Sequence, residues 1–221
     1  MSFFDIRNIF FSALGYDMSY LELFAALFGG LGVWLSARSN IWTWPVGIIA
    51  VILAFFLVYQ VQLYPDMFLQ AFYFVTGVLG WWRWANPREG EENKRRQLKA
   101  SSLGLKRFGR LTAIGIVGTY ALGTFAENLH ELFPSIFSIP SAYPYADSFV
   151  TVMSVVATFY MIEKKIESWI IWIIVDALAA YLYFSKGIKL FALEYIVFCL
   201  LASYGLWNWI REKNTTQAVP V

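Results

Sequence analysis

Long uncharged stretches alternate with short charged ones along the chain. A helix needs about 20 mostly apolar residues to cross a bilayer, because no backbone polar group can stay unpaired in hydrocarbon. The stretches therefore predict an all-α integral membrane protein with seven transmembrane helices. These are expected at residues 20–37, 42–60, 66–85, 110–128, 145–162, 168–185 and 189–210.

The remaining segments complete the predicted organisation. Residues 1–19 are too short and too interrupted to cross a bilayer, and their phenylalanines predict a short helix lying in the membrane interface. Residues 86–109 are expected to form a basic cytoplasmic loop and residues 129–144 an external loop. Residues 211–221 are expected to be a disordered tail.

Composition supports a membrane protein and excludes other classes. Of the 221 residues, 59% are hydrophobic and 14% charged, against about 25% charged in soluble domains. A net charge of +2 provides no broad basic face for a nucleic acid. The single cysteine, Cys199, excludes an intramolecular disulfide, and the single histidine, His130, excludes a metal site built from histidines. We expect no metal, no cofactor and no catalytic residue.

Lysines and arginines are distributed unequally between the two sides that seven helices would define. One side holds fourteen of the seventeen bases, and the other holds Arg7, Lys186 and Lys189. Cytoplasmic loops carry an excess of positive charge, so the side with fourteen bases, which we call the basic side, is expected to be cytoplasmic. The N-terminus is then outside and the C-terminus inside the cell.

The chain is similar to itself at a distance of 125 residues. Without a gap, this shift aligns residues 20–84 with residues 145–209, so that Trp44 meets Trp169. Each copy holds three helices, at 20–85 and 145–210, with 110–128 as a linker helix. Three helices reverse the direction of the chain, so one extra crossing makes the copies parallel. This 3+1+3 architecture is typical of transporters that bind substrate near the midplane between two repeats.

The third helix of each copy ends on the same pattern. Gly80-x-Trp82-x-Trp84 meets Gly205-x-Trp207-x-Trp209 in the alignment. Tryptophans at helix ends commonly sit at the membrane–water interface, so we expect all four to be interface anchors.

An acid lies at the centre of the sixth predicted helix. Because a helix turns by about 100° per residue, Trp169, Trp172 and Asp176 fall on one face, and Tyr183 extends the stripe. A carboxylate at this depth costs at least about 2.5–3.5 kcal/mol, so it is expected to face a cavity or a partner. The carboxylate suits hydrogen bonds to hydroxyls or pairing with a ligand cation, and the two indoles suit a flat ring that is electron-poor or cationic. The alternative is an acid that only joins neighbouring helices.

Polar groups on other helices are further candidates for substrate binding. Gln70 and Tyr73 share a face of the third helix, where they offer hydrogen-bond donors and acceptors, or else join helices. Glu194 is either a second intramembrane acid or an interfacial residue beside two lysines. Asn128 ends the linker helix, where capping is the alternative role. Gln60 and Trp44 complete the candidates.

Two segments carry a resemblance to a known family. Trp42-Thr-Trp44-Pro45-Val-Gly47 and Trp169-x-x-Trp172-x-x-x-Asp176 resemble the PnuC family of bacterial vitamin transporters, as do the 3+1+3 repeat and the Gly-x-Trp-x-Trp helix ends. The resemblance covers roughly residues 20–210. It implies a SWEET-like fold in the bacterial inner membrane and facilitated diffusion of nicotinamide riboside, a form of vitamin B3 used in NAD biosynthesis. It also implies a homo-oligomer, here expected to be a trimer.

The resemblance and the candidate residues combine into one hypothesis. Trp169 and Trp172 would face the flat cationic ring of the riboside, Asp176 would pair with its charge or bind ribose hydroxyls, and Gln70 and Tyr73 would contact its polar edges. Carriers of riboflavin, thiamine or sugars stay open as alternatives, as does proton coupling. An intramembrane protease would need paired catalytic groups that one mid-membrane acid and a loop histidine do not supply. We therefore do not expect an enzyme. Because the sequence shows no second mid-membrane acid of equal depth that could form a proton relay with Asp176, we expect a passive carrier.

Overall fold

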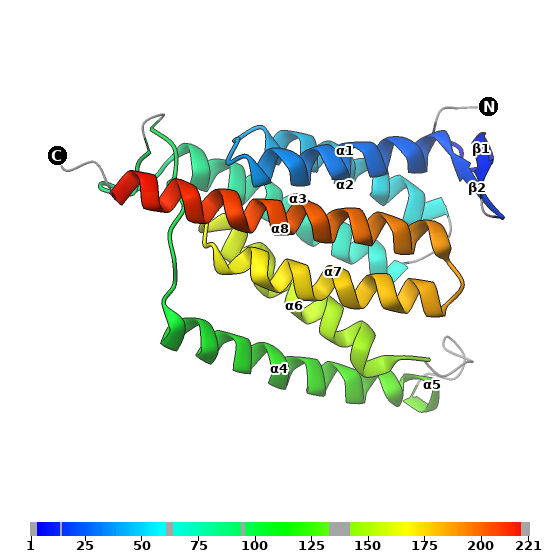
Figure 1. Cartoon of the computed structure of the whole chain (residues 1–221). Coiled ribbons are helices and arrows are strands. Elements are labelled where there is room, and N and C mark those ends of the chain that lie inside the picture. Colours follow the sequence, from blue (N-terminus) through cyan, green and yellow to red (C-terminus); the bar gives the residue numbers. More distant parts are fainter. Residues whose placement is uncertain (1–3, 14, 61–63, 94–95, 133–141, 218–221) are drawn as a thin grey trace. The chain divides into compact units, whose positions relative to one another are not determined.

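The computed structural model describes residues 4–13, 15–60, 64–93, 96–132 and 142–217 (Figure 1). Within these ranges the regular structure consists of eight helices and one two-stranded sheet. The chain divides into two compact units. Unit 1 comprises Met1–Ala100, Met161–Lys164 and Tyr204–Val221, and unit 2 comprises Ser101–Tyr160 and Lys165–Ser203.

Unit 1 is built on three consecutive helices, coloured blue to cyan-green in Figure 1: α1 (Tyr20–Ala37), α2 (Thr43–Gln60) and α3 (Tyr64–Ala85). α1 packs against α2, and α2 against α3. Close approach is possible because small residues face large ones: a Cβ atom on Gly80 of α3 would overlap the ring of Trp44 on α2. The last part of α8 (Lys189–Gln217), from Tyr204 onward, also belongs to unit 1.

The predicted interfacial helix over residues 1–19 is wrong. This segment contains an antiparallel hairpin of β1 (Ile9–Ala13) and β2 (Tyr16–Ser19), while residues 1–3 and 14 lie outside the described residues. Gly15, at φ +80°, supplies the left-handed conformation that a two-residue hairpin turn requires. Ser19 then starts α1 with a capping box, because Ser19 and Glu22 each accept the backbone N–H of the other.

Unit 2 contains α4 (Leu105–Glu127), the single turn α5 (Leu129–Leu132), α6 (Pro144–Ile162), α7 (Glu167–Ser185) and the first part of α8. Its core lies between α6 and α7, where tight packing excludes water from large apolar side chains. The buried side chains of this core are those of Met153, Ala157, Tyr160, Ile171 and Val175. Trp172 and Phe108 are partly buried against this cluster.

All seven predicted membrane helices are helices in the structure. Five of them are long and apolar enough to cross a membrane: α1, α2, α6, α7 and α8. α3 and α4 are as long, but they are not among the helices that pass the same criterion of mean hydropathy and charge. α3 includes Gln70 and Arg83, and α4 begins with a basic turn that contains Lys106 and Arg107.

The loop and tail boundaries need three corrections. The basic loop predicted over 86–109 ends early, because α4 starts at Leu105, and part of it is folded, with Leu98 and Ala100 buried. The external loop predicted over 129–144 includes α5, and 133–141 lie outside the described residues. The predicted disordered tail is helical as far as Gln217, because α8 continues through the charged residues Arg211–Lys213 and a polar last turn that contains no proline or glycine. Residues 218–221 lie outside the described range.

Candidate functional site

The most unusual side chain of unit 2 is the acid in the middle of α7. Asp176 is 5% exposed. Among the described residues, its carboxylate makes no hydrogen bond and no ion pair. Trp169 is buried on the same helix, and Trp172 is partly buried. The apolar residues around Asp176 favour a membrane-spanning helix, and Asp176 is the acid in the middle of it. A buried carboxylate without a partner among the described residues indicates a ligand site.

The start of α8 brings more candidate groups toward α7. Tyr183 of α7 stacks on two rings of α8, with ring centroids 5.4 Å from Phe191 and 5.3 Å from Tyr195. One turn further along, Cys199 donates from Sγ to the carbonyl oxygen of Ile173, 3.8 Å away.

Glu194 is half-buried on the same part of α8. Within the described residues its carboxylate makes no hydrogen bond or ion pair, and Lys186 binds Asp147 instead, at 3.0 Å. The structure therefore brings Asp176, Tyr183 and Glu194 into one helix pair, α7 and α8, of unit 2.

The candidates of unit 1 have varied surroundings. Gln70 and Tyr73 are half-buried on α3, and Tyr73 packs edge-on against Phe72. Gln60 ends α2, where its amide binds the N-terminal segment: Oε1 accepts the backbone N–H of Ile6 at 3.2 Å. Trp44 is buried, and its ring packs edge-on against Trp84 with centroids 5.4 Å apart.

Asn128 serves as a cap. It follows the last residue of α4, and its side-chain amide donates to the carbonyl oxygen of Thr124, 2.7 Å away. This bond satisfies one of the carbonyl oxygens that have no hydrogen-bond donor at a helix end.

Among the described residues, no three His, Cys, Asp or Glu side chains gather into a group that could hold a metal ion.

Two of the four tryptophans expected at the membrane interface lie elsewhere. Trp82 and Trp207 are 63% and 55% exposed, whereas Trp84 and Trp209 are fully buried. Residues two apart on a helix point in nearly opposite directions, so only one of each pair can face outward. The prediction was wrong for Trp84 and Trp209. Their partner is Lys164, a residue that the hydrophobic pattern assigns only to a loop.

The turns that follow α1 and α6 have the same hydrogen bonds, 125 residues apart. Ser39 and Lys164 both have positive φ, at 54° and 48°. The N–H of Ser39 donates to Ser36 at 2.8 Å, and the N–H of Lys164 donates to Met161 at 3.0 Å. Alignment of the sequence with itself therefore has a counterpart in local backbone geometry.

Comparison with known proteins shows which family the chain belongs to. The model of the family described as nicotinamide mononucleotide transporter matches residues 19–211. This chain belongs to that family. The family and the five apolar helices make it a multi-pass membrane transporter.

Three known proteins illustrate the similarity. The nicotinamide riboside transporter PnuC of Escherichia coli (strain K12) is 28% identical over 240 aligned residues, covering 97% of this chain and 96% of the relative. The riboflavin/roseoflavin transporter RibM of Streptomyces davaonensis is 23% identical over 199 residues, covering 90% of this chain and 88% of the relative. A crystal structure of the vitamin B3 transporter PnuC matches with a TM-score of 0.67 and 26% identity, covering 89% of this chain and 83% of that one. All three are transporters, not enzymes.

Proposed function

We propose that the protein carries nicotinamide riboside into the bacterial cell by facilitated diffusion, with one substrate site that opens alternately to the two sides of the inner membrane. The observation that carries this proposal is Asp176, a buried carboxylate with no partner among the described residues of its own chain. A relative that covers nearly the whole chain is named for the same substrate.

The chemistry of the riboside suits the groups around Asp176. Its nicotinamide ring is flat and positively charged, so a buried carboxylate stabilises it by direct charge pairing or through the ribose hydroxyls. The partly buried ring of Trp172 and the aromatic stack at Tyr183 offer faces for a cationic ring. Glu194 on α8 adds a half-buried acid to the buried one on α7.

The other candidates have supporting roles in the proposal. Gln70 and Tyr73 stay candidates for hydrogen bonds to a polar substrate, because both side chains offer a donor and an acceptor. Trp169 and Trp44 are buried and would hold the neighbouring helices in place. Gln60 and Asn128 would have to exchange the hydrogen bonds they make now before either could contact substrate.

The proposed site should bind the riboside and reject its phosphorylated form, because the two differ in charge. The family is described as transporting the mononucleotide, but a phosphate dianion near a buried carboxylate would be repelled strongly in a medium of low dielectric constant. Riboflavin is the second candidate, because one relative is named for it. Its uncharged ring would gain little from Asp176.

We further propose the 3+1+3 architecture, with α1–α3 and α6–α8 as parallel repeats and α4 as the linker helix. The identical hydrogen bonds of the two turns 125 residues apart support it. The basic side is proposed to be cytoplasmic, which sets the N-terminus outside and the C-terminus inside. We propose a trimer as the assembly.

Transport by purified protein in liposomes tests the proposal. Radiolabelled nicotinamide riboside should enter until its concentrations inside and outside are equal, and proton or sodium gradients should not change that end point. Unlabelled riboside should compete, whereas the mononucleotide and glucose should not. Accumulation above the external concentration would contradict the passive mechanism. Competition by riboflavin alone would reassign the substrate.

A further inference from the structure

A second buried charge lies in unit 1, at the ends of the helices on the basic side. The side chain of Lys164 is 0% exposed. Its Nζ donates to the carbonyl oxygen of Leu98 at 2.9 Å and lies 3.4 Å from Oε1 of Glu212. The same ammonium lies over two indole rings, 4.8 Å from the centroid of Trp84 and 5.6 Å from that of Trp209. Lys164 is therefore held by a carbonyl, a carboxylate and two aromatic faces.

The two indoles tie distant parts of the chain together in a reciprocal way. Nε1 of Trp84 donates to the carbonyl oxygen of Met161 at 3.1 Å, and Nε1 of Trp209 donates to that of Ser36 at 2.9 Å. Both the donors and the acceptors are 125 residues apart in the sequence. The last tryptophan of each third helix thus binds the end of the first helix of the other copy. Glu212 joins the same set, since its second oxygen accepts from the hydroxyl of Ser39.

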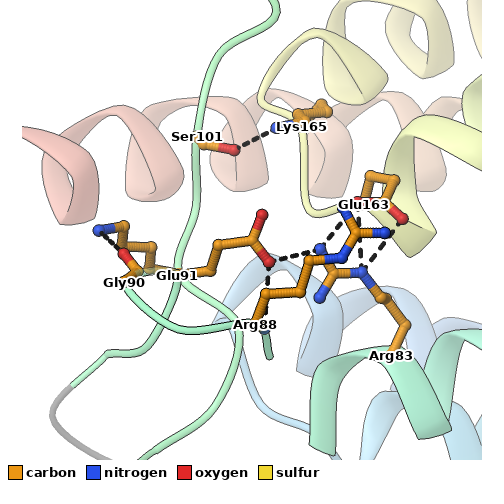
Figure 2. A network of polar contacts seen from close by, with 8 residues as sticks. Arg83, Arg88, Gly90, Glu91, Ser101, Glu163 and Lys165 are labelled. Atoms are coloured by element: carbon orange, nitrogen blue, oxygen red, sulfur yellow. Dashed lines mark hydrogen bonds and ion pairs between the residues drawn. The ribbon is translucent and has the colours of Figure 1, made fainter. Parts of the chain in front are cut away.

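Arg83 and Glu163, which precede Trp84 and Lys164 in the sequence, form a network of ion pairs with Glu91 (Figure 2). The buried guanidinium of Arg83 binds Glu163 at 3.0 Å and Glu91 at 2.7 Å. Glu91 also accepts the backbone N–H of Arg88, and these bonds, chiefly that of Arg83, hold its pKa below the ordinary value. These bonds hold Glu91 at the end of α3, and the carbonyl oxygen of Glu91 accepts the backbone N–H of Lys99 at 2.9 Å, next to the Leu98 carbonyl that Lys164 binds.

These contacts have a cost that an apolar contact would not have. Burying an ammonium removes it from water, and a hydrophobic side chain of similar size is often as stable or more stable in such a position. If the cluster parted, water would replace these partners of Lys164, so the ammonium would be solvated in an open arrangement as well. A buried ion set of this kind suits an element that must both close and open.

We propose that Lys164, Trp84, Trp209, Glu212 and the carbonyl of Leu98 form a latch that holds the basic side of the carrier shut and releases once in each transport cycle. The inference rests on the proposed function, because only a carrier with alternating access must open on that side. Release would break both indole-to-carbonyl bonds together, since each depends on the same five-part cluster.

The reactivity of a buried thiol measures opening of the latch without any substrate. Ser36 is buried beside the latch and is close in size to cysteine, so Ser36→Cys reports on it. Labelling with a hydrophilic maleimide in detergent should be at least about tenfold faster when Lys164→Ala is added, because a charged hydrogen bond and a desolvated cation–π contact are lost. Labelling of the native Cys199 in the parent protein is measured separately and subtracted.

Two controls separate opening of the latch from general loosening. Lys165→Ala removes the same charge from the next residue, whose Nζ binds Ser101 at 2.7 Å in unit 2, and it should leave the labelling rate unchanged. Ser154→Cys places a buried thiol on α6 of unit 2, and Lys164→Ala should not accelerate its labelling. The latch is overturned if Lys164→Ala does not accelerate the labelling of Ser36→Cys. It is also overturned if Lys165→Ala accelerates that labelling equally, or if Lys164→Ala accelerates the labelling of Ser154→Cys equally.

A milder variant carries the test if Lys164→Ala does not fold. Glu212→Gln keeps a hydrogen-bond acceptor for Ser39 and removes the charge that faces Lys164, so labelling of Ser36→Cys should rise severalfold. An unchanged rate overturns the latch. Failure of the proposed function is a separate outcome: the parent protein itself would bind no riboside. The labelling rates do not depend on riboside, so they would still test the latch.

Discussion

Asp176 and Lys164 are both buried charged residues, and they have opposite surroundings. Lys164 in unit 1 contacts a carbonyl, a carboxylate and two indoles. Asp176 in unit 2 is 5% exposed and has no hydrogen bond or ion pair with the described residues. The chain itself thus supplies partners for Lys164, whereas its described residues supply no partner for Asp176. We infer that the first holds the chain to itself and that the second is kept for a ligand.

The largest expected effect is on stability at Lys164. Lys164→Ala should lower the free energy of unfolding by about 3–5 kcal/mol, because removing one member of a buried ion pair leaves the rest uncompensated. Lys165→Ala should cost far less, since its side chain is only half-buried. Thermal unfolding of the two purified variants checks this. Equal losses would remove the distinction between a latch residue and a loop lysine.

Gly80 gives the next largest effect. Gly80→Ala should destabilise the protein by about 1–3 kcal/mol, because the new Cβ would overlap the ring of Trp44, which packs on Trp84. Gly47→Ala on α2 is the matched control, since a Cβ there meets nothing within 4 Å. Melting temperatures of both variants test the close packing. A neutral Gly80→Ala would mean that Trp44 can move away without cost.

Asp176 should respond in the opposite direction. Without ligand, Asp176→Asn should raise the free energy of unfolding by about 1 kcal/mol, because a buried carboxylate without a partner costs more than an amide. Chemical or thermal unfolding of the unliganded variant measures it. A clear loss of stability would show that the carboxylate has a structural partner, and the contrast with Lys164 would then disappear.

The smallest effect depends on pH. Arg83 keeps the pKa of Glu91 below its ordinary value of 4.5, so the folded state is favoured above that value and loses this stability as the pH falls through the folded pKa. Glu91→Gln should therefore cost less than about 1 kcal/mol at neutral pH, because the carboxylate is 37% exposed. The melting temperatures of parent and variant should converge below pH 4.5. Glu89→Gln, an exposed neighbour, should show no such convergence.

Sequence alone predicted the helices well and some of the ends poorly. Charged and polar residues mark the ends of the apolar stretches, so α1 and α2 begin and end within one residue of their predicted bounds. The hairpin at Gly15 was missed because its aromatic residues suggested an interfacial helix, although a glycine in a short turn between alternating residues was the available signal.

The candidate site and the latch differ in how far they could be predicted. An acid inside an apolar helix stands out in a sequence, so the pattern of residues is enough to single out Asp176. Lys164 does not stand out, because two lysines between helices are typical of a solvated turn. Only tertiary contacts from the ends of α3 and α8 bury it.

Calorimetric titration of nicotinamide riboside into the parent protein and into Asp176→Asn tests the central claim most directly. Loss of a buried charge pair with the cationic ring should weaken binding at least about tenfold in the variant, even though the variant is the more stable protein without ligand. Lys165→Ala should bind as the parent does. Unchanged affinity in Asp176→Asn would contradict the account, because Asp176 would then be a buried acid with no part in the substrate site.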